Sequence, residues 1–273
     1  MSSQLIRAAE LASSLGRVTV LDVRYRMGGP PGREEYAAGH ITGAAYVDLD
    51  TELADAPGNP IDDRGRHPLP DPAVFVAAMR RAGVSKDGPV AVYDDWQGRA
   101  AARAWWLLRH YGHRNVRVLD GGWSAWLGAG GEVEAGEPTT RGGDFAGTPG
   151  SMPVVDAGGL LAVDVVVDAR APERYRGEVE PIDPVAGHAP GAVNVDTGRN
   201  LGQDGRFRDA AELRVLYGGV GATQGADVAA YCGSGVTATH DLLALEVAGI
   251  RAALFPAGWS GWVADPAREV ERG

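Results

Sequence analysis

The sequence predicts an α/β protein of two homologous domains, each a mostly parallel sheet with helices on both faces. Short runs of β-branched and other apolar residues alternate along the chain with amphipathic stretches of helical period. Continuous apolar strands separated by helices are typical of a parallel sheet that is covered on both faces. In addition, four blocks of sequence from the first half recur in the same order in the second half. An ordered repeat of this kind predicts that the fold itself is duplicated.

Each repeated block has its own structural character. The first is an apolar strand ending in Asp-x-Arg, the second a Gly-His-x-x-Gly-Ala turn, the third a buried strand and the fourth a Gly-Trp-Ser-x-Trp segment. The matching pairs are residues 18–24 and 164–170, 39–44 and 187–192, 89–94 and 226–232, and 120–126 and 256–262. The spacing between blocks shows that the second copy has the shorter middle.

The stretches between these blocks supply the helices and the connection between the domains. Helical patterns occupy residues 71–82, 99–111, 210–217 and roughly 237–248. Residues 134–150 are rich in Gly, Pro and Thr and have no period, which is typical of a linker. We therefore expect a first domain over residues 1–134, a linker over 135–150 and a second domain over 151–273.

Composition excludes several classes of partner. The formal net charge is −10 and no basic stripe stands out, which argues against nucleic-acid binding. No apolar stretch approaches the ~20 residues that a membrane span requires, so no membrane partner is expected. No histidine, cysteine and carboxylate cluster has the spacing of a zinc site, and no Walker or Rossmann glycine motif is present. We expect no metal and no cofactor.

Cysteine usage indicates the compartment. The chain has one cysteine, which cannot form an intramolecular disulfide, and the N-terminus lacks a basic stretch followed by an apolar block. These features predict a protein of the reducing cytoplasm. Because the duplication already supplies a two-domain interface, a monomer is expected.

That cysteine, Cys232, lies where a strand changes into a helix. The apolar run 227–231 ends at it, the loop 232–238 follows, and a helical pattern begins near Thr237. Backbone N–H groups at a helix N-terminus have no partner within the helix and, with the helix dipole, stabilise a negative charge. Gly233 and Gly235 allow the backbone to turn tightly and to approach the sulfur. The pattern therefore predicts a reactive thiolate rather than a small core residue.

The first copy differs from the second at this position. Asp94 stands where Cys232 stands in the second copy, and the loop after Asp94 has no nucleophilic sulfur. We expect the second domain to carry the chemistry and the first domain to be inactive, contributing a wall.

Taken together, the blocks resemble the tandem-domain rhodanese family of sulfurtransferases over nearly the whole chain. The resemblance rests on the paired Asp-x-Arg strand ends, the His40 and His188 turns, the Cys-Gly-Ser-Gly-Val-Thr-Ala loop and the Gly-Trp-Ser-x-Trp segments. It implies two rhodanese-like domains with the catalytic cysteine in the second. The loop is similar to that of the 3-mercaptopyruvate branch, since thiosulfate-specific relatives tend to place basic residues just after the cysteine.

The chemistry that the resemblance implies agrees with the residues. A Cys232 thiolate would take sulfur from 3-mercaptopyruvate or thiosulfate as a persulfide and pass it to cyanide or a thiol, with ping-pong kinetics. Backbone N–H groups along the loop would hold the persulfide anion, as an oxyanion hole does. The loop residues are Gly233, Ser234, Gly235, Val236, Thr237 and Ala238. Ser234 either hydrogen-bonds the donor or the departing enolate or is a small turn residue, and Thr237 is expected to cap the following helix.

The resemblance also implies donor-binding residues outside the loop. Arg174 matches a substrate-binding arginine, and a guanidinium suits a carboxylate or thiosulfonate. His40 matches a histidine that some family mechanisms place in a serine–histidine–aspartate relay, although the repeat at His188 favours a shared structural turn.

Two positions depart from the family pattern. Asp183 occupies the place of a second arginine, nine residues after Arg174, and would repel an anionic donor unless another arginine replaces it. The candidates for that replacement are Arg176, Arg99 and Arg206. No aspartate precedes His40 in residues 28–35, so Glu34 or Glu35 would have to complete a relay.

Two other functions share parts of this pattern. Cysteine phosphatases bind phosphate with Cys-x5-Arg, but the arginine position is Ala238 here, which argues against phosphate chemistry. A persulfide carrier or regulatory binding module without turnover stays open. Sulfur release to cyanide from each donor separates it from an enzyme.

Overall fold

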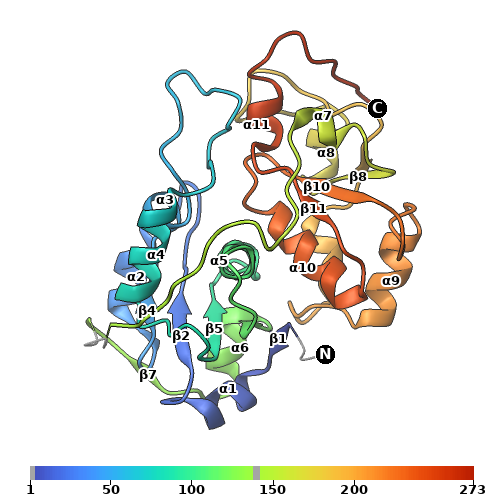
Figure 1. The fold of residues 1–273 in the computed structure, drawn as a ribbon. Helices are drawn as coiled ribbons and strands as arrows, with labels where there is room; N and C mark the ends of the chain where they lie inside the picture. The colour runs from blue at the N-terminus through green and yellow to red at the C-terminus, as the bar shows by residue number, and fades with distance from the viewer. Residues whose placement is uncertain (1–3, 138–141) are drawn as a thin grey trace. The chain divides into compact units, whose positions relative to one another are not determined.

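The computed structural model describes residues 4–137 and 142–273, and the chain divides into two compact units. As far as its residues are described, the first unit comprises Met1–Asp55, Pro70–Met152 and Asp204–Arg206, and the second comprises Ala56–Leu69, Pro153–Gln203 and Phe207–Gly273. Figure 1 shows both units, each of which contains its own parallel sheet.

The first unit is built on a parallel sheet in the order β1-β6-β5-β2-β4, counted over the described residues. Its strands, with the short antiparallel pair β3–β7, are β1 (Leu5–Ile6), β2 (Thr19–Asp22), β3 (His40–Ile41), β4 (Ala45–Tyr46), β5 (Val90–Tyr93), β6 (Val116–Leu119) and β7 (Val133–Glu134). All four residues of β5 are buried, because this central strand has helices on both of its faces.

Helices cover the two faces of this sheet. They are α1 (Ala8–Ser14), α2 (Gly32–Ala38), α3 (Leu49–Glu52), α4 (Pro72–Arg81), α5 (Arg99–His110) and α6 (Gly122–Gly128). The α4 helix begins where predicted, because Asp71 accepts hydrogen bonds from the N–H groups of Ala73 and Val74 and Pro72 occupies the first turn. The α5 helix packs against β5 and β6 and buries Trp105 and Trp106.

The second unit repeats this plan with a parallel sheet in the order β11-β10-β8-β9 within the described ranges. Its strands are β8 (Val165–Asp168), β9 (Val193–Asn194), β10 (Val228–Tyr231) and β11 (Ala253–Leu254). Its helices are α7 (Ala157–Leu160), α8 (Pro172–Tyr175), the 3₁₀ turn η1 (Thr197–Asn200), α9 (Ala210–Gly218), α10 (Ala238–Ala248) and α11 (Gly258–Trp262). The four long helices predicted from sequence are α4, α5, α9 and α10, and all are confirmed.

Local sequence sets the ends of the second unit's helices. Asp209 and Glu212 form a reciprocal capping box at the start of α9. The α10 helix ends at Gly249, whose φ of 79° lies in the left-handed region that favours glycine. Contrary to our expectation, Thr237 makes no side-chain cap, because it is already helical with φ −71° and ψ −18°.

The two Asp-x-Arg strand ends form the same buried polar cluster in each unit. Arg24 pairs with Asp22, whose carboxylate also accepts the hydroxyl of Tyr93. In the second unit Arg170 pairs with Asp168, with nitrogen and oxygen 2.6 Å apart. The Tyr231 hydroxyl accepts the N–H of Ala189, as that of Tyr93 accepts the N–H of Ile41. These matching contacts confirm the duplication at the level of side chains.

The units depart from the predicted domains at two segments, residues 204–206, which group with the first unit, and residues 56–69. Residues 56–69 belong in sequence to the predicted first domain but pack with the second unit. Close approach to α11 explains this, because a Cβ on Gly65 would lie 2.1 Å from the Ala257 carbonyl oxygen and one on Gly261 would lie 2.8 Å from that of Asp63. Both positions therefore require glycine.

The predicted linker is described in part. Residues 138–141 lie outside the described residues, whereas Phe145 near the linker's end is buried in the first unit, where its N–H donates to Val84. No helix in the described ranges is long and apolar enough to cross a bilayer.

Candidate active site

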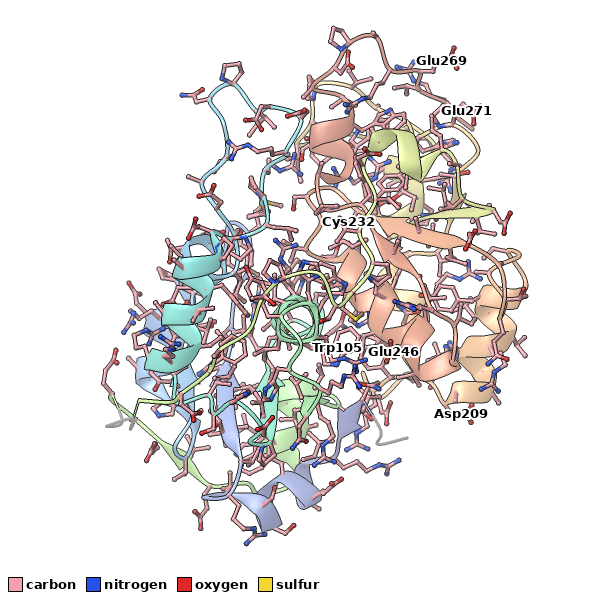
Figure 2. The ribbon with its side chains drawn as sticks, in the orientation of Figure 1. Trp105, Asp209, Cys232, Glu246, Glu269 and Glu271 are labelled. Carbon is pink, nitrogen blue, oxygen red and sulfur yellow. The ribbon has the colours of Figure 1, made fainter. Side chains whose placement is uncertain are left out.

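Cys232 lies at the carboxyl end of β10, the strand paired with both β8 and β11 (Figure 2). It directly follows Tyr231, which is in register with Asp168. The cysteine is 1% exposed, and α10 begins six residues later at Ala238. In parallel α/β sheets the carboxyl ends of strands form the ligand-binding edge. The strand therefore delivers the thiol to the edge where the fold binds ligands.

The loop after Cys232 is fixed by backbone contacts with α11. The carbonyl oxygen of Cys232 accepts the N–H of Trp259 at 2.7 Å, and that of Gly233 accepts the N–H of Ser260 at 2.9 Å. A Cβ on Gly258 would lie 2.7 Å from the Cys232 oxygen, and the φ of Gly258 is 59°. Only glycine permits this approach without strain.

The N–H groups of the loop are available to an anion. Within the described part of the chain, the N–H groups of Gly233, Ser234, Val236 and Thr237 have no acceptor among protein atoms. The α10 helix follows directly and adds the positive end of its dipole. This arrangement stabilises negative charge beside the cysteine sulfur.

The first unit has an anion in the corresponding loop. The Asp94 carboxylate accepts the N–H groups of Trp96 at 2.9 Å, Gly98 at 2.8 Å and Ala101 at 2.8 Å. Burial raises the pKa of Asp94, and these three hydrogen bonds oppose the shift. The first-unit loop is thus filled by its own side chain.

Ser234 is held by a histidine that sequence reasoning missed. Its Oγ lies 2.7 Å from Nδ1 of His67, which belongs to the 56–69 segment. The sequence offered one signal for this segment. The stretch between the second and third repeated blocks is longer in the first copy, and residues 56–69 lie within it. Comparison of the two halves could identify residues 56–69 as extra, but it could not show that they pack with the second unit.

His40 lies in a different setting from the one the relay hypothesis requires. It is fully buried in the first unit, stacks on Tyr36 with ring centroids 4.0 Å apart, and bonds Tyr36 and Glu134 through its two ring nitrogens. His188 stacks on Tyr175 in the same way. These contacts favour the shared structural turn. The acid beside His40 is Glu134 and not Glu34 or Glu35.

Arg174 lies beside the loop, as predicted. A Cβ on Gly233 would lie 3.6 Å from its Nη1. Its Nε and Nη2 donate to the Glu180 carboxylate at 3.2 and 2.6 Å, and Nη2 also lies 3.3 Å from Asp183. Burial acts to raise the pKa of Glu180, but hydrogen bonds from Arg174 and from the backbone hold it below its ordinary value.

Asp183 does not face the loop as an unpaired charge. Its two carboxylate oxygens contact Arg66 and Arg174, and it is only 8% exposed. Burial raises its pKa, and the two guanidinium groups act in the opposite direction. Of the expected replacement arginines, Arg176 pairs with Glu178, whereas Arg99 and Arg206 belong to the first unit and stay predictions. Arg66, also on the 56–69 segment, is the arginine that sequence reasoning missed.

A buried polar network supports the first turn of α10. Asn200 donates to Asp241 at 2.7 Å and accepts the Tyr217 hydroxyl at 2.9 Å. Burial raises the pKa of Asp241 well above its ordinary value. The network ties η1 and α9 to the helix that follows the cysteine loop.

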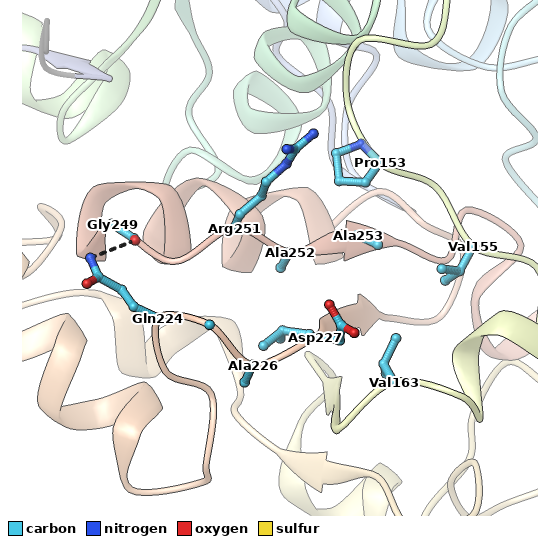
Figure 3. A pocket seen from close by; sticks show the side chains of 12 residues that line it. Pro153, Val155, Val163, Gln224, Ala226, Asp227, Gly249, Arg251, Ala252 and Ala253 are labelled. Atoms are coloured by element: carbon cyan, nitrogen blue, oxygen red, sulfur yellow. Dashed lines mark hydrogen bonds between the residues drawn. The ribbon is translucent and has the colours of Figure 1, made fainter.

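A separate pocket of about 500 Å³ lies at the other end of the strand (Figure 3). Its walls include Asp227 and Val228 at the start of β10, and Gln224 there donates to the Gly249 carbonyl at 3.1 Å. Since Cys232 follows the last residue of the same strand, this pocket is not the place of thiol chemistry.

Comparisons with known proteins agree with this architecture. The rhodanese-like domain family matches residues 7–129 and 156–265. A Mycobacterium tuberculosis protein provisionally named thiosulfate sulfurtransferase SseB is 45% identical over 98% of this chain and 97% of its own. A Pseudomonas aeruginosa protein provisionally named 3-mercaptopyruvate sulfurtransferase is 43% identical over 100% of this chain and 99% of its own.

A solved structure shares the whole fold. The crystal structure of SseA from Escherichia coli, described as a 3-mercaptopyruvate sulfotransferase, superposes with a TM-score of 0.83 at 30% identity. The match covers 95% of this chain and 100% of SseA. The two matched domains, the relatives at 43–45% identity and the shared fold lead to one conclusion. The chain belongs to the rhodanese family of tandem-domain sulfurtransferases.

Proposed function

We propose that the protein transfers sulfur from 3-mercaptopyruvate or thiosulfate, through a persulfide on Cys232, to cyanide or a thiol. The observation that carries the proposal is the buried thiol at the end of β10, followed by a loop with four available N–H groups and flanked by Arg66 and Arg174. The names of the relatives support the two donors.

The first half-reaction loads the sulfur. The Cys232 thiolate attacks the outer sulfur of thiosulfate, the donor S–S bond breaks, and sulfite leaves with the electron pair. With 3-mercaptopyruvate the C–S bond breaks instead, and the electron pair leaves on the enolate of pyruvate, which then takes a proton. Both routes leave a Cys–S–S⁻ persulfide.

The second half-reaction returns the thiolate. Cyanide or an acceptor thiolate attacks the outer sulfur, the S–S bond of the persulfide breaks, and the electron pair returns to Cys232. Because the persulfide is an anion at the start of this step, the loop N–H groups act as an oxyanion hole does. Removal of one such donor typically costs ~3 kcal/mol of barrier.

The Ser234–His67 pair supports proton delivery to the enolate. Ser234 belongs to the cysteine loop, and its hydroxyl is hydrogen-bonded to His67. Imidazole can supply a proton near neutral pH, and the hydroxyl can relay it. Thiosulfate cleavage releases sulfite and needs no such proton.

Small-molecule donors and acceptors are the partners, and a monomer in the reducing cytoplasm is the state we infer. The single cysteine is the basis for the compartment, since a transferable persulfide needs a free thiol. Sedimentation of the purified protein tests the monomer, and cell fractionation tests the compartment.

The test compares the two donors side by side. Thiocyanate release is measured with 3-mercaptopyruvate and with thiosulfate, for the wild-type protein and for Cys232→Ser. We expect turnover with at least one donor and none in the variant. Mass spectrometry of donor-treated protein should place one added sulfur atom on Cys232. Turnover that persists in Cys232→Ser contradicts the mechanism, and loading without release favours the carrier function.

A further inference from the structure

Arg66 is fixed beside the cysteine loop by its own backbone. Its N–H donates to Oγ of Ser260 at 3.0 Å, and the N–H of the same serine donates to the Gly233 carbonyl at 2.9 Å. Ser260 is buried in α11. Ser260 thus holds both the 56–69 segment and the loop, so two hydrogen bonds to one residue set the position of the Arg66 backbone relative to the loop.

The guanidinium of Arg66 lies directly over the loop. A Cβ on Gly233 would lie 3.0 Å from its Nη2, whereas its Nη1 is paired with Asp183. The Nε atom is buried without a hydrogen-bond partner, and Nη2 has no acceptor within the part of the chain that the structure describes. Nε and Nη2 form one edge of the planar guanidinium, and that edge is unoccupied.

The two arginines at Gly233 therefore differ in what they can offer. Arg174 directs its Nε and Nη2 to the Glu180 carboxylate, which leaves only Nη1 toward the loop. Arg66 keeps a complete Nε–Nη2 edge. Such an edge matches the two oxygens of a carboxylate or of a thiosulfonate group with two parallel hydrogen bonds. An anionic ligand with two oxygens would satisfy this buried donor.

Asp183 supplies the carboxylate that pairs with Nη1 of Arg66. It lies nine residues after Arg174, where the family pattern has a second arginine, and its partner Arg66 comes from a distant segment. The site thus keeps two guanidinium groups, although the second comes from another part of the chain. Asp183 contacts only one end of the Arg66 guanidinium and orients the other edge.

We propose that Arg66 binds the anionic group of the sulfur donor through Nε and Nη2, and that Asp183 is its positioning residue. Arg174 adds its Nη1 group near Gly233. The proposal rests on the proposed sulfur transfer and names the group that recognises the donor.

The test is the donor KM measured for four variants. With 3-mercaptopyruvate as the donor, Arg66→Ala should raise KM roughly 10- to 100-fold, as the loss of a bidentate charged contact does. Arg66→Lys keeps the charge without the planar edge and should lie in between. Asp183→Asn should raise KM while kcat is largely retained, since it acts through Arg66. Arg64→Ala is the matched control, because Arg64 lies two residues away, pairs with exposed Asp62 and should leave KM unchanged.

Exchange of the charges at positions 183 and 66 separates an effect of Asp183 on the position of Arg66 from an effect on protein stability. Asp183→Arg alone should raise KM, because it sets a third guanidinium against Arg66 and Arg174. Adding Arg66→Asp should recover part of the loss, and a melting temperature for each variant checks folding. If Arg66→Ala does not fold, Arg66→Lys carries the test.

The outcomes distinguish the two proposals. A wild-type protein inactive with both donors contradicts the proposed function. An active wild type with an unchanged KM in Arg66→Ala and Arg66→Lys overturns the role of Arg66 alone. Improved 3-mercaptopyruvate use in Asp183→Arg by itself overturns the positioning role of Asp183.

Discussion

Asp94 and Cys232 hold corresponding positions in the two units, because the backbone oxygen of each accepts the N–H of a tryptophan that begins the repeated Trp-Ser-x-Trp segment. The distances are 2.8 Å from Trp123 and 2.7 Å from Trp259. A carboxylate oxygen is two bonds from Cβ, and so is the outer sulfur of a cysteine persulfide. Asp94 with its three N–H partners therefore shows how this type of loop holds an anion.

Removal of the Asp94 carboxylate should destabilise the protein. Asp94→Ala leaves three backbone N–H groups without their acceptor, and we expect a loss of about 2–5 kcal/mol in the free energy of unfolding. Urea denaturation measures it. Asp95→Ala is the control, because Asp95 pairs with the exposed Arg26 and should cost less than about 1 kcal/mol. Equal losses in the two variants would argue against the anion loop.

Replacement of His67 should affect the two donors differently. His67→Gln removes the proton source for the pyruvate enolate, so kcat with 3-mercaptopyruvate should fall on the order of 100-fold. With thiosulfate the fall should be much smaller, because sulfite leaves without that proton. Steady-state kinetics with both donors measure the difference between the two falls in kcat. His40→Gln, a histidine substitution in the first unit, is measured for comparison. A matching fall for both donors would instead indicate a structural role for His67.

A methyl group at Gly258 should distort the loop. The φ of Gly258 is 59°, and the added Cβ would lie 2.7 Å from the Cys232 oxygen. Gly258→Ala should lower the free energy of unfolding by roughly 1–3 kcal/mol and slow sulfur transfer. Gly218→Ala in α9, where a Cβ meets nothing within 4 Å, should lower neither the free energy of unfolding nor the rate of sulfur transfer. The prediction is wrong if Gly258→Ala and Gly218→Ala have the same melting temperature.

The buried Asp241 should make stability depend on pH. Burial raises its pKa in the folded protein, so it keeps its proton to a higher pH there than in the unfolded chain, where it ionises above about pH 4. Its stabilising contribution is complete below that pH and declines as the pH rises. Asp241→Asn is neutral throughout, so its stability relative to wild type should increase as the pH rises above about 4.

Urea denaturation across this pH range measures the Asp241 effect. Glu269→Gln, at an exposed position, is the control and should show a constant difference from wild type. A constant difference in Asp241→Asn as well would mean that Asp241 titrates alike in the folded and unfolded chain.

The sequence by itself determined the duplicated fold, the four long helices and the place of Cys232. Those features depend on local signals, such as helical period, the Asp71 cap, the buried run before Cys232 and the glycines after it. The family resemblance also singled out Arg174 as a donor-binding residue, and the structure has it beside the loop. For His40, the repeat at His188 favoured a shared structural turn, and its contacts in the first unit agree with that interpretation.

Only the tertiary structure decided which distant segments complete the site. His67 and Arg66 lie on residues 56–69, far in sequence from Ser234 and Asp183, and no local pattern encodes those pairings. They depend on the close packing of Gly65 and Gly261 that seats this segment against α11. The sequence could show that Asp183 departs from the family pattern. The partner that neutralises Asp183 is fixed by three-dimensional proximity, which neither period nor spacing along the chain specifies.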